Sequence, residues 1–554
     1  MRLHARCPRP DTTTDNIALA RILHRERRLD EAVRICSDIL RRNSANVDAL
    51  ILLGTIRQQQ QRGDEAHWLL KAALSHIDCD LERENADPAQ LLNQRGKTLH
   101  YLGRYFEALV SYDKAIAASP NEAELHLNRG IALYYLGRYK AAVASYDKAD
   151  QLSPGDAGCL LRRGVALHKL NDYDRALANF DEALRIEPDN PFVHNARGET
   201  LACQTRYQDA LAAFERAAAC DHDFIQPRWN IAVTRILHGD YRRGWQEYEC
   251  RWLNPLARPR KFTAPLWLGD APLDGKTILL HAEQGFGDTI QFVRYAPLLA
   301  ARGAKVLVEV QADLRALISR MTGIAAVFAQ PKQQTEDGRI DGAPVQLPRQ
   351  ARFPRFDYHC PMMSLPLAFK TELDSVPASE SYLSADDTLT AHWQERLPEG
   401  HARVGIAWAG NPHHWEDRNR SIALTRLLPL LSAPCSFVSL QKSATTAEMS
   451  ILARLDNVVH FGEELSDFDD TAAVIASLDL VVTVDTAVAH LAAAMGKPVW
   501  ILLAHAPEWR WLLHRSDSPW YPTVRLFRQQ QLDGWAPVVE QIRVELGSWL
   551  ESRA

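Results

Sequence analysis

Four short segments of the sequence combine residues that can bind phosphate or move a proton, and each lies at the end of a strand-like run. The first is Gly285-Phe286-Gly287-Asp288, after the apolar run 278–284. Glycines let the backbone approach a ligand closely, and a carboxylate that opens a helix can act as a general base. An Asp in this place is also a common helix cap, the role that composition alone favours. The glycine spacing is not a full dinucleotide-binding fingerprint.

The second and third segments supply basic and amide side chains. Arg418 and Arg420 follow an apolar run that ends at Gly410. Their guanidinium groups could clamp a diphosphate through paired hydrogen bonds, although a solvated loop explains them equally well. Gln441 and Lys442 end another apolar run and offer an amide for a ribose or base edge and an ammonium group for phosphate. The specificity of that pair alone is low.

The fourth segment, VVTVDTAVAHLAAAMGKPVWILL, carries the strongest signal. A strand is expected to end at Asp485 and a helix to start at once, so the free N–H groups of Thr486 and Ala487 would form an anion site. His490 would lie one turn into this helix, on the side that Asp485 caps. A capped helix with a core histidine explains any one of these residues, but it explains the whole string less well.

No segment predicts a metal site. His413 and His414 are adjacent but have no further ligands at a suitable spacing, and the nine cysteines are scattered without a CxxC pair. We therefore expect no metal, no disulfide framework and a reducing compartment.

Length and charge limit the remaining classes. With 554 residues the chain is too long for one core, so about three domains are expected. A formal net charge of -5 gives no global electrostatic argument for nucleic acid or an anionic membrane as a partner. The sequence shows neither a transmembrane run nor an apolar stretch after its basic N-terminus. We expect a cytoplasmic protein without an integral membrane segment, with peripheral attachment to the inner membrane as an alternative.

The first half of the chain repeats every 34 residues, with small residues, an aromatic residue and a proline in fixed columns. The columns contain Gly96, Gly130, Gly164 and Gly198, then Ala108, Ala142, Ala176 and Ala210, then Tyr112, Tyr146, Phe180 and Phe214, and finally Pro120, Pro154 and Pro188. Small residues let two helices cross closely, the aromatic ring fills the gap between them, and the proline ends the second helix. Weaker copies extend the array to about six and a half units over residues 13–252.

This array resembles the tetratricopeptide repeat, whose helical hairpins stack into an α-solenoid with a concave groove. We expect the groove to bind a peptide or protein. The column residues mainly pack the hairpins together, so binding would depend on other side chains of the first helix in each unit. Asn93, Asn128 and Asn195 are polar candidates there, although solvated surface explains them as well.

After residue 252 the pattern changes. A proline-rich linker, residues 253–276, is followed by strand-like runs rich in Val, Ile and Leu that alternate with helical segments. This alternation indicates parallel sheets in two α/β domains, at 277–385 and 400–550. A ligand is expected between them, at the carboxyl ends of the strands.

Residues 278–550 resemble the ADP-heptose:lipopolysaccharide heptosyltransferases, glycosyltransferase family 9, most specifically in the string from Asp485 to Pro498 and in GFGDTIQF. The resemblance implies a bacterial protein with a GT-B fold of two Rossmann-like domains. The acceptor would bind to the first domain and the nucleotide sugar to the second. In this resemblance the catalytic aspartate of the family falls on Asp288, and its glycine-rich turn falls on Gly285 and Gly287. The basic phosphate ligand of the family falls in the region of Gly410, Arg418 and Arg420, and its nucleotide-sugar carboxylate falls on Gln441, near Lys442. The diphosphate-binding start of a helix in the family matches Asp485, Thr486, Ala487 and His490.

Three departures from the family pattern leave the donor open. Ala487 replaces a glycine, an arginine replaces the usual lysine, and Gln441 replaces an acidic residue. We expect inverting, metal-independent transfer of a hexosyl, heptosyl or N-acetylglucosaminyl group from a nucleotide-diphosphate sugar, without a further cofactor, to an acceptor recruited by the repeats. The order of parts is similar to that of the O-linked N-acetylglucosamine transferases, which is an architectural analogy. The alternative is a non-catalytic repeat scaffold with a degenerate GT-B domain.

Overall fold

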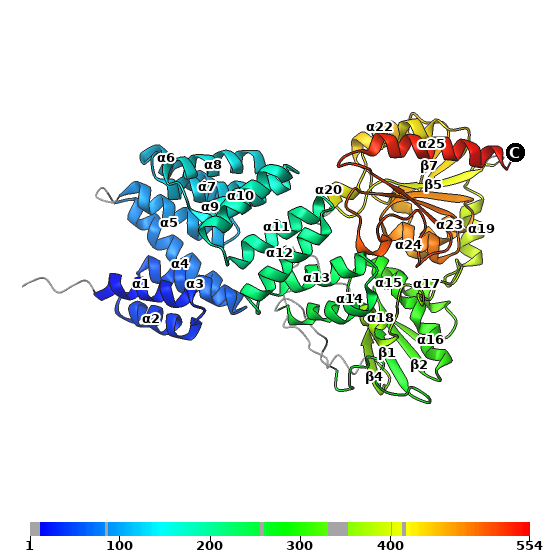
Figure 1. Cartoon of the computed structure of the whole chain (residues 1–554), viewed down its shortest axis with the longest axis horizontal. Coiled ribbons are helices and arrows are strands. Elements are labelled where there is room, and N and C mark those ends of the chain that lie inside the picture. Colours follow the sequence, from blue (N-terminus) through cyan, green and yellow to red (C-terminus); the bar gives the residue numbers. More distant parts are fainter. Residues whose placement is uncertain are drawn as a thin grey trace, which may run out of the picture. The chain divides into compact units, whose positions relative to one another are not determined.

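The computed structural model describes residues 12–83, 87–254, 260, 262–330, 353–399, 402–412 and 417–553 (Figure 1). His413 and His414, considered above as metal ligands, lie outside these residues. The chain divides into two compact units, Met1–Leu201 and Ala202–Ala554, and each is described by itself.

The first unit is built from consecutive helices, drawn from blue to cyan in Figure 1. They are α1 (Thr12–Arg25), α2 (Leu29–Arg42), α3 (Val47–Gln59), α4 (Gly63–Leu81), α5 (Pro88–Tyr101), α6 (Tyr105–Ala118), α7 (Ala123–Tyr135), α8 (Tyr139–Leu152), α9 (Ala157–Lys169), α10 (Tyr173–Ile186) and most of α11 (Pro191–Cys203). Consecutive helices from α1 to α10 pack against each other, as expected for stacked helical hairpins.

The repeated columns have the packing role that the sequence predicts. A Cβ atom on Gly130 would lie 2.5 Å from Cε1 of Tyr146, and one on Gly164 would lie 2.5 Å from Cε1 of Phe180. Only glycine therefore leaves room for the ring of the second helix against the first. The turn between the two helices also repeats, with positive φ at Gly137 (71°).

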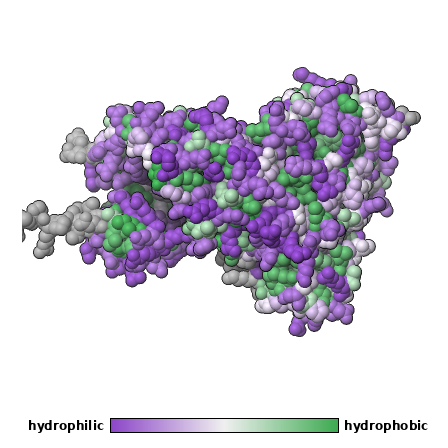
Figure 2. Space-filling view, in the orientation of Figure 1, coloured by the Kyte–Doolittle hydropathy of each residue, from purple (hydrophilic) through white to green (hydrophobic). Residues whose placement is uncertain are grey.

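Two of the three asparagines predicted to face the groove are buried. Asn128 Nδ2 donates a hydrogen bond of 2.9 Å to Oδ1 of buried Asn93, and Nδ2 of buried Asn195 donates to Glu199 Oε1 at 2.9 Å. The first bond joins α7 to α5, and the second lies within α11. Large apolar side chains are exposed on the repeats instead, among them Phe106 and Tyr135. In Figure 2 the apolar residues form separate patches on a mainly hydrophilic face.

The last repeat helices belong to the second unit. They are α12 (Tyr207–Cys220), α13 (Ile225–Leu237) and α14 (Tyr241–Tyr248), followed by the short η1 (Glu249–Leu253). With α1–α11 they give fourteen helices, or seven pairs, in the described repeat region, close to the six and a half units expected. The compact units divide at 201/202, whereas the repeat pattern runs to 252. The physical reason is that Trp245 of α14 lies in one hydrophobic cluster with residues of both sheets.

The first sheet contains four parallel strands in the order β3-β2-β1-β4. They are β1 (Thr277–His281), β2 (Lys305–Val310), β3 (Ala326–Ala329) and β4 (Tyr358–Pro361), with helices α15 (Phe286–Phe292), α16 (Ala296–Ala301), α17 (Arg315–Ser319) and α18 (Leu365–Ala368). Part of the proline-rich linker lies against this sheet, because the backbone N–H of buried Trp267 donates to His359 O at 2.9 Å.

The second sheet contains six parallel strands in the order β10-β9-β8-β5-β6-β7. They are β5 (Arg403–Ala407), β6 (Ser436–Ser439), β7 (Val458–His460), β8 (Leu480–Val484), β9 (Val499–Leu503) and β10 (Val524–Arg528). The helices are α19 (Asp387–Gln394), α20 (Asp417–Arg420), α21 (Leu424–Leu431), α22 (Thr446–Leu452), α23 (Phe468–Ala476), α24 (Ala487–Ala494) and α25 (Trp535–Glu551).

The sequence prediction of a helical solenoid followed by parallel sheets with helices is confirmed at this level. The apolar runs became buried central strands because helices cover both faces of such sheets. Among the described residues, every helix is too short or too polar to cross a lipid bilayer.

Candidate functional site

The predicted site residues gather at the carboxyl ends of strands where the order of each sheet reverses. The reversal lies between β1 and β4 in the first sheet and between β5 and β8 in the second. Ligands of open parallel sheets bind at such reversals. Gly285 and Asp288 follow β1, Gly410 follows β5, and Asp485 and Thr486 follow β8. Segments far apart in the sequence therefore reach the places where this architecture binds ligands.

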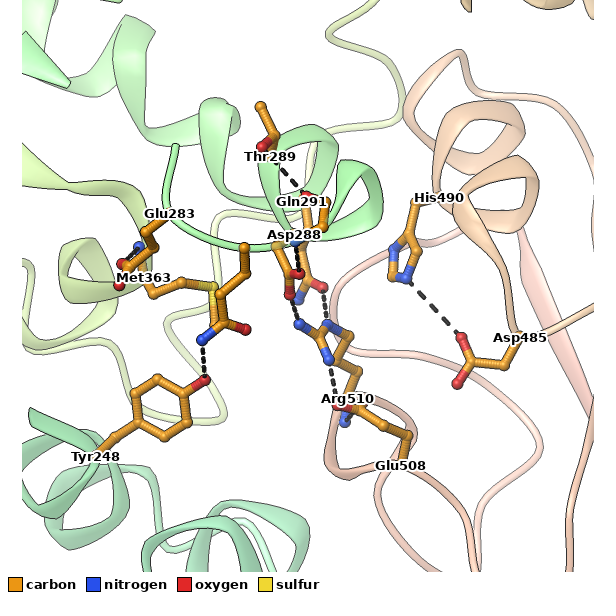
Figure 3. A network of polar contacts seen from close by, with 12 residues as sticks. Tyr248, Glu283, Asp288, Thr289, Gln291, Met363, Asp485, His490, Glu508 and Arg510 are labelled. Carbon is orange, nitrogen blue, oxygen red and sulfur yellow. Dashed lines mark hydrogen bonds and ion pairs between the residues drawn. The ribbon is translucent and has the colours of Figure 1, made fainter. Parts of the chain in front are cut away.

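Helices α15 and α24 bring these two ends together. The two helices contact each other, and a Cβ atom on Gly287 would lie 2.8 Å from Cδ2 of His490. Gly287, the second glycine of the turn, is thus needed for α15 to approach His490 of α24 closely. Figure 3 shows His490 projecting from α24, with the Asp288 carboxylate of α15 directed toward Arg510.

Asp288 has a partner on each carboxylate oxygen. Its Oδ2 accepts a hydrogen bond of 2.8 Å from the backbone N–H of Gly285, so it caps the start of α15 as composition suggested. Its Oδ1 forms an ion pair with Arg510. Capping does not exclude a role as base, because each carboxylate oxygen can accept a second hydrogen bond.

Arg510 was not predicted from the sequence. It lies in the short η7 (Trp509–Trp511) after β9, pairs with both Asp288 and Glu508, and donates from Nε to Gln291 Oε1 at 2.9 Å (Figure 3). Burial lowers the pKa of Arg510 to about 10, which leaves it cationic at neutral pH. Arg510, which follows a strand of the second sheet, is therefore fixed against α15, which follows a strand of the first sheet. The dense string Glu508-Trp509-Arg510-Trp511 at a strand end was the available sequence signal.

His490 is a buried, neutral side chain. Its Nδ1 lies 2.9 Å from the hydroxyl of Tyr521, and its ring stacks on Trp511 with 5.3 Å between centroids. Burial lowers the pKa of His490 to about 3. Its Nε2 lies 3.9 Å from Asp485 Oδ1, so the two side chains adjoin as predicted, but the histidine carries no charge at neutral pH.

Arg418 and Arg420 both belong to α20, but the Arg420 side chain reaches the start of α24, whereas Arg418 is exposed. Arg420 Nη1 donates to the backbone oxygen of Asp485 at 3.3 Å, and its Nε donates to Asp417 Oδ1 at 3.2 Å. A Cβ atom on Gly410 would lie 2.5 Å from Arg420 Nη2, so this glycine makes room for the guanidinium group. Of the two predicted arginines, Arg420 is the one that lies beside the helix start.

The start of α24 has the geometry of an anion site. The helix begins at Ala487, and Thr486 precedes it in an extended conformation without a hydrogen bond from its own side chain to the helix end. Thr486 and Ala487 are both half-buried. The first N–H groups of a helix carry partial positive charge, and Arg420 adds a full charge beside them. Burial raises the pKa of the Asp485 carboxyl, whereas the Trp511 indole and the Arg420 charge lower it by less.

Gln441 and Lys442 contact the backbone in this structure. The buried Gln441 accepts at Oε1 from the backbone N–H groups of Trp408 (3.2 Å) and Ala409 (3.1 Å), and its Nε2 donates to Ser443 O at 3.3 Å. Lys442 Nζ donates to Ser466 O at 2.8 Å. Gln441 therefore braces the turn that leads to Gly410.

Together these groups offer two kinds of chemistry. Asp288 can accept a proton, and Arg420 with the start of α24 can stabilise an anion that leaves. In the described part of the chain, no three His, Cys, Asp or Glu side chains are grouped so that they could hold a metal ion.

Comparison with known proteins gives matches to two families. Residues 93–157 and 157–190 match the tetratricopeptide repeat, and residues 461–531 match glycosyltransferase family 9 (heptosyltransferase). The last match includes Asp485, His490 and Arg510. The chain thus combines tetratricopeptide repeats with a region similar to glycosyltransferase family 9, as the sequence motifs indicated. The second match supports a glycosyltransferase at the level of the family.

One curated relative is Protein FlbA of Caulobacter vibrioides, which is 27% identical over 343 residues. The match covers 60% of this chain and 56% of FlbA, so the chain spans a little over half the length of that relative. Among solved structures, MamA of Desulfovibrio magneticus RS-1 is 22% identical, with 30% of this chain and 96% of MamA covered at a TM-score of 0.29. A thermophilic tetratricopeptide-repeat protein of Thermus thermophilus, TTC0263, is 23% identical, with 34% and 98% covered at a TM-score of 0.29.

Proposed function

We propose that this protein transfers a sugar from a nucleotide-diphosphate donor to an acceptor hydroxyl, with its two sheet domains acting as the halves of a GT-B enzyme. The observation that carries the proposal is the close contact of Gly287 with His490. Because of this contact, a carboxylate of one domain, Asp288, lies beside the helix start of the other.

The donor diphosphate would bind at the start of α24. The N–H groups of Thr486 and Ala487, at the positive end of the helix, would donate to the diphosphate. The Arg420 guanidinium lies beside the same turn. As the bond between the anomeric carbon and the diphosphate breaks, these groups stabilise the charge that develops on the leaving oxygen. In this proposal they supply the positive charge that a metal ion supplies in other transferases.

Asp288 would act as the general base. The acceptor oxygen attacks the anomeric carbon from the side opposite the diphosphate, its proton passes to Asp288, and the configuration of that carbon is inverted. The Arg510 ion pair fixes the direction of the Asp288 carboxylate. The proton then leaves to solvent.

The repeats would recruit a peptide or protein that carries the acceptor. Tetratricopeptide repeats are scaffolds for such partners. We place the reaction in the cytoplasm, where nucleotide sugars are made. The net charge of -5 supports a protein partner better than a nucleic acid.

A direct test first identifies the donor by thermal shift with UDP-, GDP- and ADP-sugars and then compares two variants. Asp288→Asn removes the base but keeps an oxygen that can cap Gly285. We expect transfer to fall by at least about 100-fold, with donor binding unchanged. Asp386→Asn is the matched control, because Asp386 caps α19 through the N–H groups of Thr388 and Leu389. Full activity in Asp288→Asn would remove the assignment of the base.

A non-catalytic scaffold is the second candidate, and one observation favours it. The amide of Gln441, which stands where the family has a carboxylate for the nucleotide sugar, is engaged by the backbone of Trp408, Ala409 and Ser443. If none of the nucleotide sugars raises the melting temperature, the scaffold is supported and the transferase is not.

A further inference from the structure

The end of the repeat region holds the two residues that precede the glycine-rich turn. Gln284 Nε2 donates a hydrogen bond of 3.1 Å to the hydroxyl of Tyr248, the last residue of α14 (Figure 3). Arg251 of η1 donates from Nε and Nη2 to the two carboxylate oxygens of Glu283, at 2.9 and 3.0 Å. Two consecutive residues after β1 are thus held by two residues of one short segment.

This segment is fixed by its surroundings. Tyr248 is 1% exposed, and its ring packs on Trp229 and Trp245 with centroid distances of 4.5 and 5.7 Å. Arg251 is also buried, lies 5.0 Å from the centre of the Tyr248 ring, and donates to Ser364 Oγ at 2.7 Å. Tyr248 and Arg251 therefore give the turn a rigid support.

The support extends from the turn into α15. The backbone oxygen of Gln284 accepts from Gln311 Nε2 at 2.7 Å, and Gln311 Oε1 accepts from Thr289 Oγ1 at 2.9 Å. The backbone N–H of Gly285 donates to Asp288. A displacement of Gln284 is thus transmitted to Asp288 by the hydrogen bond at Gly285 and to the same helix through Gln311.

We propose that Tyr248 and Arg251 are positioning residues for Asp288, so that the last repeat helix is part of the reaction machinery as well as of the repeat array. The proposal rests on the function proposed above for Asp288. Neither residue touches the reacting atoms. They fix Gln284 and Glu283, and the turn that these residues begin sets the direction of the Asp288 carboxylate.

The first test compares two tyrosines of α14 in the full-length chain. Tyr248→Phe removes the bond to Gln284 and keeps the ring, whereas Tyr241→Phe removes a buried bond to Trp520 Nε1 of 3.0 Å in the same helix. We expect amide hydrogen exchange in residues 283–292 to be at least about fivefold faster in Tyr248→Phe and unchanged in Tyr241→Phe. Equal exchange of this segment in the two variants would overturn the proposal.

The second test measures turnover of the nucleotide sugar that stabilises the protein best. We expect Tyr248→Phe to lower kcat by about tenfold and to leave KM for the donor within about twofold, because misplacement of a base weakens the reaction step more than donor binding. Gln284→Met, at an exposed side chain, should cause the same loss, and the double variant no further loss. Additive losses, or a change in KM alone, would contradict the proposal.

The two proposals fail in different ways. If the unmodified protein turns over none of the nucleotide sugars, the proposed function fails, while hydrogen exchange still shows whether Tyr248 orders the turn. If turnover is present but the Tyr248→Phe turn exchanges as in the unmodified protein, the positioning role fails and the proposed function stands.

Discussion

Glycine packs against a ring in both compact units, but the two kinds of ring differ in chemistry. In the repeats, Gly130 and Gly164 face the apolar faces of Tyr146 and Phe180. In the second unit, Gly287 faces the imidazole of His490. The repeat contact recurs every 34 residues, whereas the contact at His490 joins two helices, α15 and α24, that follow strands of different sheets.

The comparison separates stability from geometry at the site. A repeated contact shares its stabilising effect among several equivalent copies, so one substitution weakens the stack locally. A contact made once between helices of two sheets determines where the polar groups that follow both sheets lie. Substitutions of the same type should therefore lower stability in the repeats and activity in the second unit.

The largest effect is expected from Gly287→Ala. The new methyl group would lie 2.8 Å from His490, which cannot yield easily because it is buried, stacked on Trp511 and bonded to Tyr521. The starts of α15 and α24 must then separate, and we expect transfer to fall by about 100-fold, as for other displacements of about 1 Å. Steady-state kinetics measure the loss, and near-normal rates would show that α15 and α24 need not approach so closely.

Gly130→Ala should instead act on stability. Its methyl group would lie 2.5 Å from the Tyr146 ring, and overpacking of this kind costs about 2 kcal/mol of unfolding free energy. Thermal unfolding should begin at a lower temperature, while the affinity for the donor stays the same. A loss of donor affinity in this variant would contradict the division between the two regions.

Acid should weaken both regions through neutral histidines, among them half-buried His168 in the repeats and buried His490 beside the sheets. Burial lowers the pKa of His490 to about 3 and that of His168 to about 4, below the value of about 6.5 in the unfolded chain. Each neutral histidine contributes stability above pH 6.5 that is lost as the pH falls, by about 1.4 kcal/mol per pH unit until the folded pKa is reached.

Denaturant titrations between pH 7 and 5 measure this loss. His168→Gln should lessen the acid sensitivity of the repeats, and His490→Gln should lessen that of the sheets. An unchanged pH dependence in either variant would show that other groups cause the loss in that region.

Gly410→Ala should have the smallest effect. The added methyl group meets Arg420 Nη2, the far end of a flexible side chain, which can move aside. We expect about fivefold weaker donor binding, close to the loss of one net hydrogen bond, with stability unchanged. Calorimetric titration with the identified donor checks this, and unchanged affinity would remove Arg420 from the diphosphate site.

Periodicity predicted the repeats because every copy must solve the same packing problem with the same few residues. The strands were predictable as well, since buried parallel strands form continuous apolar runs such as LVVTV before Asp485. At the site, the sequence predicted which residues follow which strand, and the rule for strand ends brought Asp288, Gly410 and Thr486 to the order reversals.

Partners from distant segments could not be predicted in this way. Arg510 is 222 positions from Asp288, and Tyr248 is 36 positions from Gln284. Neither pair has a period or a fixed spacing, because tertiary packing alone brings them together. The same limit applies to Gln441, whose sequence position gave no sign that its amide would bind the backbone of Trp408 and Ala409.

The division of the chain at Leu201 and Ala202 also has a consequence for how such proteins can diversify. Upstream of it, hairpins can be gained or lost in steps of 34 residues, because each contacts mainly its neighbours. Downstream, Trp245 and Tyr248 share a core with the sheets, so α12–α14 must be inherited together with them. Recombination that exchanges binding specificity should therefore join chains before α12, and a junction at the end of the repeat pattern should yield insoluble products.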